Sequence, residues 1–384
     1  MRTDTDTGKG VLNTAMMVIL ANKWPISRPH FLVLAITVLL SHMASAAPTS
    51  DGDIRDIRVV GQAVRSVGNT PARLDVGISV STKVRNKSGT DMEAAFRKTE
   101  ALLIGQRLRG ELERNDDWGV IRLFPEPSVI PQLTVQLTIL ASDGRELVVA
   151  AVVRAVTGET MGSSVYRDIS VNDDYTDDKT DPFADLYVTM VNDIVHSVSS
   201  ASHQETYLRS LSSLRYASEL VPEAFPDYLG QETGLYSVRR EPSREDPMLV
   251  RLNRLQDYEL LFVDTIDEQL ANVSREVSDA YYLWMKSSKE QLDWLDLRRE
   301  RGVSAETLRN ESTFTRLQAV YAAHRSLKIH EQELFELVLE LENETRATAV
   351  YANEQVFKLS GTLEQQYQEW RATLRRINDL ESTL

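Results

Sequence analysis

The chain contains no cysteine among its 384 residues. A disulfide framework, a thiolate metal site, a cysteine nucleophile and a lipid-modified N-terminal cysteine are therefore excluded. Basic residues are also in the minority, because 43 Lys and Arg stand against 57 Asp and Glu, which gives a net charge of −14. Nucleic acids and anionic membrane surfaces bind basic patches, so this balance argues against both as main partners.

Long hydrophobic runs are equally scarce, and the clearest one lies near the N-terminus. Residues 31–40 are almost all apolar, follow Lys23 and Arg28, and precede an A-x-A cleavage pattern at 44–46. This order is typical of a signal peptide. The run is shorter than the roughly 20 residues that span a bilayer, so we predict a cleaved signal at 1–46. An uncleaved signal that anchors the chain is the alternative, and no later segment has membrane length.

The next part of the chain is predicted to be an α/β domain at 57–200, after a flexible mature N-terminus at 47–56. Alternation of apolar and polar residues predicts half-buried strands, and helical periodicity predicts helices between them. An Asp143–Gly144 turn between two such strands is a strong hairpin signal. The predicted strands cover 57–65, 73–85, 120–124, 132–140, 146–156 and 163–169, and the predicted helices cover 91–114 and 183–198.

The chain after residue 200 has a different pattern, in which the apolar residues recur mostly at helical spacing. A helix at 205–220 and a Pro- and Gly-rich stretch without regular structure form a linker at 201–247. Beyond it, 248–384 is predicted as a domain of long amphipathic helices, with Thr362 and Gln365 spaced as a capping box. The apolar stripes comprise Leu252, Leu255, Phe262, Ile266, Leu270, Val273, Val277, Tyr281 and Trp284, then Leu317, Val320, Leu327, Leu334, Val338 and Leu341, and finally Leu363, Tyr367, Trp370, Leu374, Ile377 and Leu380.

These patterns predict an α+β protein, in which a mixed, largely antiparallel α/β domain precedes the long helices. A helical hairpin or bundle fits the stripes, either closed or projecting. The heptads are too irregular for a continuous coiled-coil filament.

One candidate cation site is the acidic loop at 172–181. Carboxylate-rich loops can bind Ca²⁺, but this one lacks the spacing of an EF-hand loop. A solvated surface loop is the favoured interpretation. Its acidic residues are Asp173, Asp174, Asp177, Asp178 and Asp181.

Other reactive residue types occur without a supporting pattern. His196 and His203, and His324 and His330, form no H-E-x-x-H motif and lack a third ligand nearby. The glycines and serines between 158 and 164 form neither a G-x-S-x-G motif nor a Walker loop. We therefore predict no catalytic residue, no cofactor-binding residue and no metal ligand.

Aromatic residues and an arginine recur in the long helices. Trp, Tyr and Arg dominate interface hot spots, so a binding surface is one interpretation. A buried core of the helices is the favoured one. The residues are Tyr281, Tyr282, Trp284, Trp294, Tyr367, Trp370 and Arg371.

The strand pattern from Leu133 to Tyr166, together with the stretches at 181–187, 245–252 and 359–371, resembles a set of uncharacterised proteobacterial cell-envelope proteins. The N-terminal half is similar to the small α/β domains of envelope lipoproteins such as the activators of penicillin-binding proteins. This resemblance implies a periplasmic location. It supplies no catalytic residue.

The favoured hypothesis is a non-catalytic interaction or structural protein of the bacterial cell envelope; a regulator or adaptor of an envelope complex is a narrower version that rests on the resemblance alone. The α/β domain would bind one envelope protein and the long helices would reach or brace another. Self-association through the C-terminal helices is compatible with the same stripes. The alternative is a hydrolase whose site is not visible as a sequence motif.

Overall fold

The computed structural model of the protein describes residues 54–57, 73–84, 91–115, 118–175, 181–199, 205–243, 245–301 and 313–382. The predicted signal peptide at 1–46 and the strand residues 58–65 lie outside this part of the chain. Residues 48–384 form one compact unit.

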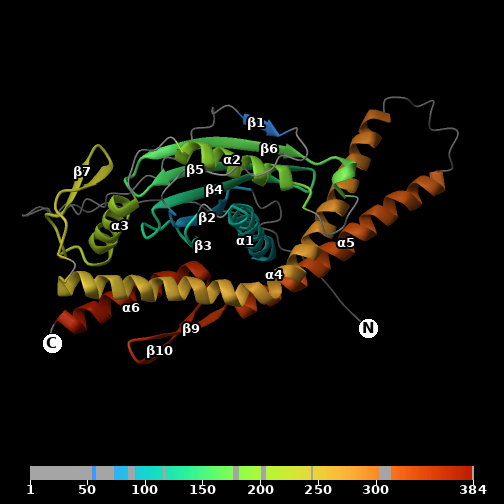
Figure 1. Ribbon diagram of the computed structural model, residues 1–384. Helices are drawn as coiled ribbons and strands as arrows, with labels where there is room; N and C mark the ends of the chain where they lie inside the picture. The colour runs from blue at the N-terminus through green and yellow to red at the C-terminus, as the bar shows by residue number, and fades with distance from the viewer. Residues whose placement is uncertain are drawn as a thin grey trace, which may run out of the picture. The chain divides into compact units, whose positions relative to one another are not determined.

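A mixed six-stranded sheet is the centre of the α/β part (Figure 1), with the strand order β1-β6-β5-β4-β2-β3. The consecutive strands β4, β5 and β6 form an antiparallel meander, whereas β1 joins β6, and β2 joins β4 and β3, by parallel pairing. The α+β class predicted from the sequence is confirmed. The strands are β1 (Ile54–Ile57), β2 (Val76–Thr82), β3 (Ile121–Leu123), β4 (Leu133–Ser142), β5 (Glu146–Ala155) and β6 (Thr160–Ile169).

The first strand differs from the sequence prediction, which assigned residues up to 56 to a flexible N-terminus. Ile54 to Ile57 instead pair with β6 at the edge of the sheet. Arg55 forms an ion pair with Asp193, which holds this strand to the helix beneath it. Four residues are too few to show an alternation of apolar and polar side chains, so the strand is recognised only by its pairing with β6.

The β4–β5 hairpin forms at its predicted turn. Gly144 has a φ of +84°, a conformation that glycine adopts without strain. The Asp143 carboxylate accepts hydrogen bonds from the backbone N–H groups of Arg145 (3.0 Å) and Glu146 (2.9 Å). Such local bonds are the reason aspartate favours turns.

Helices α1 (Asp91–Glu113) and α2 (Ala184–Ser199) cover one face of the sheet, and α1 lies between the sheet and the long helix α4 (Figure 1). A Cβ atom at Gly105 would lie 2.6 Å from Leu123 of β3, so glycine permits the close approach. The opposite side of α1 faces α4, where Ser274 donates a hydrogen bond to Gln106 (2.6 Å). The sequence predicted one buried side for this helix, but its position between two layers buries two.

Helix α3 (Glu205–Leu220) has its predicted bounds, but the stretch after it is more regular than predicted. A hairpin of β7 (Leu229–Glu232) and β8 (Leu235–Val238) forms there. Thr233 and Gly234 both have positive φ, +49° and +85°, as the two-residue hairpin turn requires. The N–H of Tyr236 donates to the carbonyl of Thr157 (2.7 Å), which attaches this hairpin to the β5–β6 turn.

The C-terminal part contains the predicted long helices. Helix α4 (Pro247–Arg301) has 55 residues and therefore a length of about 80 Å. It packs against α5 (Thr313–Glu344) and α6 (Leu363–Ser382). The predicted capping box is confirmed, because Thr362 N–H donates to the Gln365 side chain (3.0 Å) and Gln365 N–H donates to Thr362 Oγ1 (3.3 Å).

A second hairpin that the sequence analysis did not predict joins α5 to α6. Its strands are β9 (Ala347–Ala352) and β10 (Gln355–Ser360). The turn places Asn353 and Glu354 at φ values of +47° and +61°. Glutamate is uncommon in this conformation, so the usual turn signal is weak here.

One hydrophobic core runs through both predicted domains. Buried residues of 57–200 and of 248–384 belong to a single cluster. The linker does not separate them, because α1 has one side on the sheet and the other on α4. None of the helices among the described residues combines enough length with enough apolar character to cross a membrane.

Candidate binding site

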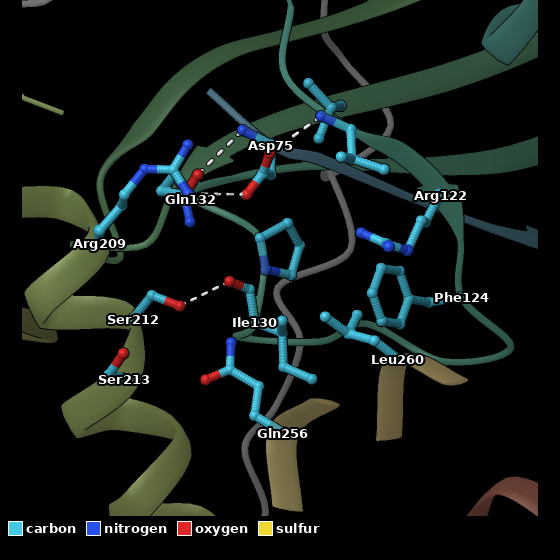
Figure 2. A pocket seen from close by; sticks show the side chains of 13 residues that line it. Asp75, Arg122, Phe124, Ile130, Gln132, Arg209, Ser212, Ser213, Gln256 and Leu260 are labelled. Atoms are coloured by element: carbon cyan, nitrogen blue, oxygen red, sulfur yellow. Dashed lines mark hydrogen bonds and ion pairs between the residues drawn. The ribbon is translucent and has the colours of Figure 1, made fainter. Parts of the chain in front are cut away.

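A small pocket lies where the amino ends of β2, β3 and β4 meet α3 and α4, and its volume is about 280 Å³ (Figure 2). Ligands of open α/β sheets usually bind at the carboxyl ends of the parallel strands, so this pocket lies at the opposite edge. Its lining residues come from three loops, from β2 and β3, and from two helices. They are Asp75, Val76, Val120, Arg122, Phe124, Ile130, Pro131, Gln132, Arg209, Ser212, Ser213, Gln256 and Leu260.

The floor of the pocket is apolar. Phe124, Ile130 and Pro131 are buried, and Pro131 lies against Gly77 of β2. A Cβ atom at Gly77 would lie 2.5 Å from Pro131 and 3.2 Å from Phe124. The glycine therefore lets these two rings rest directly on the strand.

Asp75 is the only carboxylate of the lining, and both of its oxygens are occupied. Oδ1 accepts a hydrogen bond from the N–H of Val120 (2.9 Å), and Oδ2 accepts one from Arg209 (3.2 Å). The N–H of Asp75 donates to the side-chain oxygen of Gln132 (2.9 Å). A carboxylate bound in this way holds the three loops together and is not placed as a free general base.

The other polar side chains are not arranged for nucleophilic chemistry. Ser212 donates to the carbonyl of Ile130 (2.5 Å), and among the lining residues there is no histidine. Arg122 binds Asp264 through two atoms, Nε (2.7 Å) and Nη2 (3.1 Å). A serine nucleophile needs an adjacent base, and the lining residues place none beside Ser212.

Two fully buried glutamates, Glu100 of α1 and Glu259 of α4, join the layers of the fold. Glu100 of α1 accepts hydrogen bonds from Ser142 of β4 (2.6 Å) and Tyr281 of α4 (2.7 Å), and it pairs with Arg97 (2.7 Å). A buried charge is stable only when such partners replace water. This network therefore fixes α4 against the α/β part.

The second buried glutamate, Glu259, lies on the face of α4 that meets α3 and α6. Tyr367 donates to its Oε1 (2.5 Å), and Arg371 lies 3.5 Å from the same oxygen. Burial raises the pKa of Glu259, and Arg371 opposes that rise. Sequence reasoning missed both glutamates and all of the pocket residues.

Asp168 of β6 is a buried carboxyl whose Oδ2 has no hydrogen-bond partner among the described residues. Burial, followed by the charges of Asp174 and Asp185, raises its pKa from 3.8 to about 7. The folded state therefore binds this proton more tightly than the unfolded state. The contribution to stability is fully present below about pH 4 and is lost as the pH rises to about 7.

Replacing Asp168 by asparagine is expected to raise the free energy of unfolding at pH 8 by about 2–4 kcal/mol. At pH 4 the change should be small, because the carboxyl is then protonated in the folded state and partly protonated in the unfolded state. Urea unfolding of both proteins across this pH range measures the difference. The matched control is Asp279→Asn on the exposed side of α4, for which no pH-dependent gain is expected. An equal gain for Asp168→Asn at pH 4 and pH 8 would contradict the titration argument.

The aspartates of the acidic loop at 172–181 lie in different structural settings. Asp173 and Asp174 fall in a short 3₁₀ helix (Asn172–Tyr175), and residues 176–180, with Asp177 and Asp178, lie outside the described part. The side chain of Asp181 is only 10% exposed, and its carboxylate accepts hydrogen bonds from the N–H of Phe183 (2.9 Å) and from the hydroxyl of Tyr282 (3.3 Å). The surface-loop prediction is therefore wrong for Asp181, because its carboxylate caps the start of α2.

The histidines are not brought together. His196 is exposed on α2, His324 is exposed on α5, and His330 is half-buried and 3.7 Å from Glu333, whereas His203 lies outside the described part. The glycines and serines between 158 and 164, the other candidate motif, belong to the β5–β6 turn and the start of β6, where Gly158 has a φ of +88°. In the described ranges, no three His, Asp or Glu side chains are placed to hold a metal ion.

Most of the aromatic residues singled out in the long helices belong to the core, as the favoured interpretation expected, whereas Trp294, near the end of α4, is half-buried and outside the core. Tyr281, Tyr282, Tyr367 and Trp370 are all buried. Trp284 is half-buried and makes an edge contact with Phe96 of α1, with ring centroids 4.9 Å apart. These side chains are not available as a surface hot spot.

Comparison of the chain with protein-family models, with curated proteins and with solved structures finds no match in any of the three.

Proposed function

We propose that the chain is an exported, non-catalytic interaction protein of the bacterial cell envelope. In this proposal the α/β part binds one component, and the distal parts of α4 and α5 bind another. A binding role suits a chain in whose pocket no nucleophilic side chain is paired with a general base. The excess of acidic over basic residues also disfavours nucleic acid as a partner.

The distal parts of the two long helices carry this proposal. We call residues 290–301 of α4 and 313–333 of α5 the distal arm. None of its described side chains is buried, whereas α4 before it and α5 after it contribute to the core. Figure 1 shows both helices continuing past the sheet. A helix gains its stability in proteins mainly from packing, so a long arm whose described side chains are all exposed or half-buried suggests an external partner.

The exposed surface of the arm is partly apolar. Leu295 is 42% exposed, Tyr321 is 67% exposed and Ile329 is 52% exposed. Large exposed apolar residues cost solubility when they gather, and they often mark interaction sites. We therefore place the binding of a second envelope protein on this arm.

The test uses photo-crosslinking from single positions of the full-length chain in the native envelope. A benzophenone side chain at Tyr321 or at Ile329 is expected to give a specific adduct with one envelope protein. The matched control is Tyr351 on β9, which is 62% exposed but lies outside the arm. Leu295→Glu should reduce the Tyr321 adduct about tenfold without lowering the melting temperature.

Equal adducts at Tyr321 and Tyr351, or none at all at Tyr321 and Ile329, would contradict the assignment of the arm. An adduct with twice the mass of the chain would assign the arm to self-association instead. The same preparation tests export, because mass spectrometry of the mature protein should find its N-terminus at Ala47.

A further inference from the structure

The rim of the pocket in Figure 2 has unused hydrogen-bond donors. Gln132 uses its side-chain oxygen for the N–H of Asp75, and within the described residues its NH2 group has no partner. The side chains of Gln256 and Ser213 also make no hydrogen bond in that part of the chain. Arg122 binds Asp264 through Nε and Nη2, so its Nη1 group is still available.

Acceptors are few at the same rim. Both oxygens of Asp75 are occupied, and no second carboxylate lines the pocket. The two lining arginines are each paired with carboxylates, Arg122 with Asp264 and Arg209 with Asp75, so the groups of the rim that are still free are mainly N–H and O–H donors. A ligand that satisfies them must supply oxygen acceptors.

The apolar floor indicates that the ligand also carries an apolar group. Phe124, Ile130 and Pro131 form an apolar surface below the donors, and a volume of about 280 Å³ holds one medium-sized side chain. Small-molecule sites commonly combine an apolar floor with a few convergent polar groups.

We propose that this pocket binds a carboxylate carried by an apolar residue, as at the C-terminus of a peptide. The apolar side chain would lie on Phe124 and Ile130, and the carboxylate would accept hydrogen bonds from a free donor of the rim, either Arg122 Nη1 or the amide of Gln132, which lie on opposite sides of the pocket. A phosphate fits less well, since it carries more charge and would leave the apolar floor uncovered. This inference names the chemistry that the α/β part recognises and in that respect rests on the proposed function.

Isothermal titration calorimetry of the mature chain tests the pocket without the arm partner. The probes are an alanine-rich hexapeptide ending in leucine, the same peptide with an amidated C-terminus, and N-acetyl-leucine. The acid peptide is expected to bind with a Kd on the order of 0.1–1 mM, and the amide at least tenfold more weakly. Equal affinity for the acid peptide and N-acetyl-leucine would support the carboxylate site and identify a small acid as the source.

Two variants locate the binding. Gln256→Glu adds a carboxylate to the rim and should reduce the affinity for the acid peptide about tenfold or more. Arg375→Gln removes a cation from the exposed side of α6, away from the lining residues, and should leave the affinity unchanged.

The inference is overturned if the acid and amide peptides bind alike, if neither binds at about 5 mM, or if Gln256→Glu binds like the unmodified chain. The crosslinks from Tyr321 are independent of these titrations. Failure of the pocket and failure of the distal arm are therefore distinguishable.

Discussion

Replacing Glu100 by alanine is expected to lower the free energy of unfolding by about 3–5 kcal/mol, because it removes one partner of a buried ion pair. The side chain is fully buried, and it accepts hydrogen bonds from Ser142 and Tyr281 while it pairs with Arg97. All three donors would lose their acceptor in a space that water does not reach. Urea unfolding followed by far-ultraviolet circular dichroism measures the change.

The same experiment tests whether α4 and the sheet share one core. Tryptophan fluorescence and circular dichroism should report one coincident transition, and Glu100→Ala should shift both signals together. Two separate transitions, of which only one moves, would contradict the single core. The matched control is Glu113→Ala at the exposed end of the same helix, which breaks only a surface pair with Arg109 and should cost less than about 1 kcal/mol.

Replacing Trp370 by alanine is expected to cost about 3–5 kcal/mol through the cavity that it leaves in the core of α4, α6 and the β9–β10 hairpin. The ring is fully buried and makes an edge contact with Phe357, with centroids 5.4 Å apart. Its indole N–H also donates to the carbonyl of Tyr258 (3.0 Å). Thermal and urea unfolding both measure this loss.

Trp370→Phe separates the two contributions, because it retains most of the aromatic volume but removes the hydrogen bond to Tyr258. It should cost roughly 1–3 kcal/mol, the range for a buried acceptor left unsatisfied. Leu380→Ala is the matched control on the same helix, since this leucine is 68% exposed. A cost for Trp370→Ala as small as that of Leu380→Ala would show that α6 does not pack as described.

The sequence was most informative where the signal is local. The β4–β5 hairpin follows from Asp143 and Gly144, and the start of α6 follows from Thr362 and Gln365, because these residues bond to their own backbone neighbours. The bounds of α3 are likewise as predicted. Interactions within a few residues do not depend on what lies across the core.

Weak turn signals explain the elements that were missed. The β9–β10 turn uses Asn353 and Glu354, and the β7–β8 turn uses Thr233 and Gly234, with strands of only four residues beside it. Neither turn has the Asn-Gly or Asp-Gly pair that marks a hairpin most clearly. Tertiary contacts such as that between Tyr236 and Thr157 select these conformations.

The two buried glutamates are marked in the sequence by their position within apolar stripes of the helices. Glu100 lies within an apolar stripe, with Phe96 four residues before it and Leu103 and Ile104 three and four residues after it. Glu259 has the same surroundings at the same spacing: Leu255, Phe262 and Val263. A glutamate at an apolar position of a helix predicts a buried partner, although the pattern cannot say which residue that partner is.

Residue order alone was sufficient for the α+β class, for most of the helices and for the meander of the sheet, because hydrophobic periodicity and turn chemistry act over a few residues. It also contains the signal pattern at 31–46 on which the predicted export depends. Only the tertiary structure joined the sheet and the long helices into one core, and only it assembled the pocket from Asp75, Gln132, Arg209 and Gln256. Those contacts link residues far apart in the chain, and they form only when the elements pack side by side.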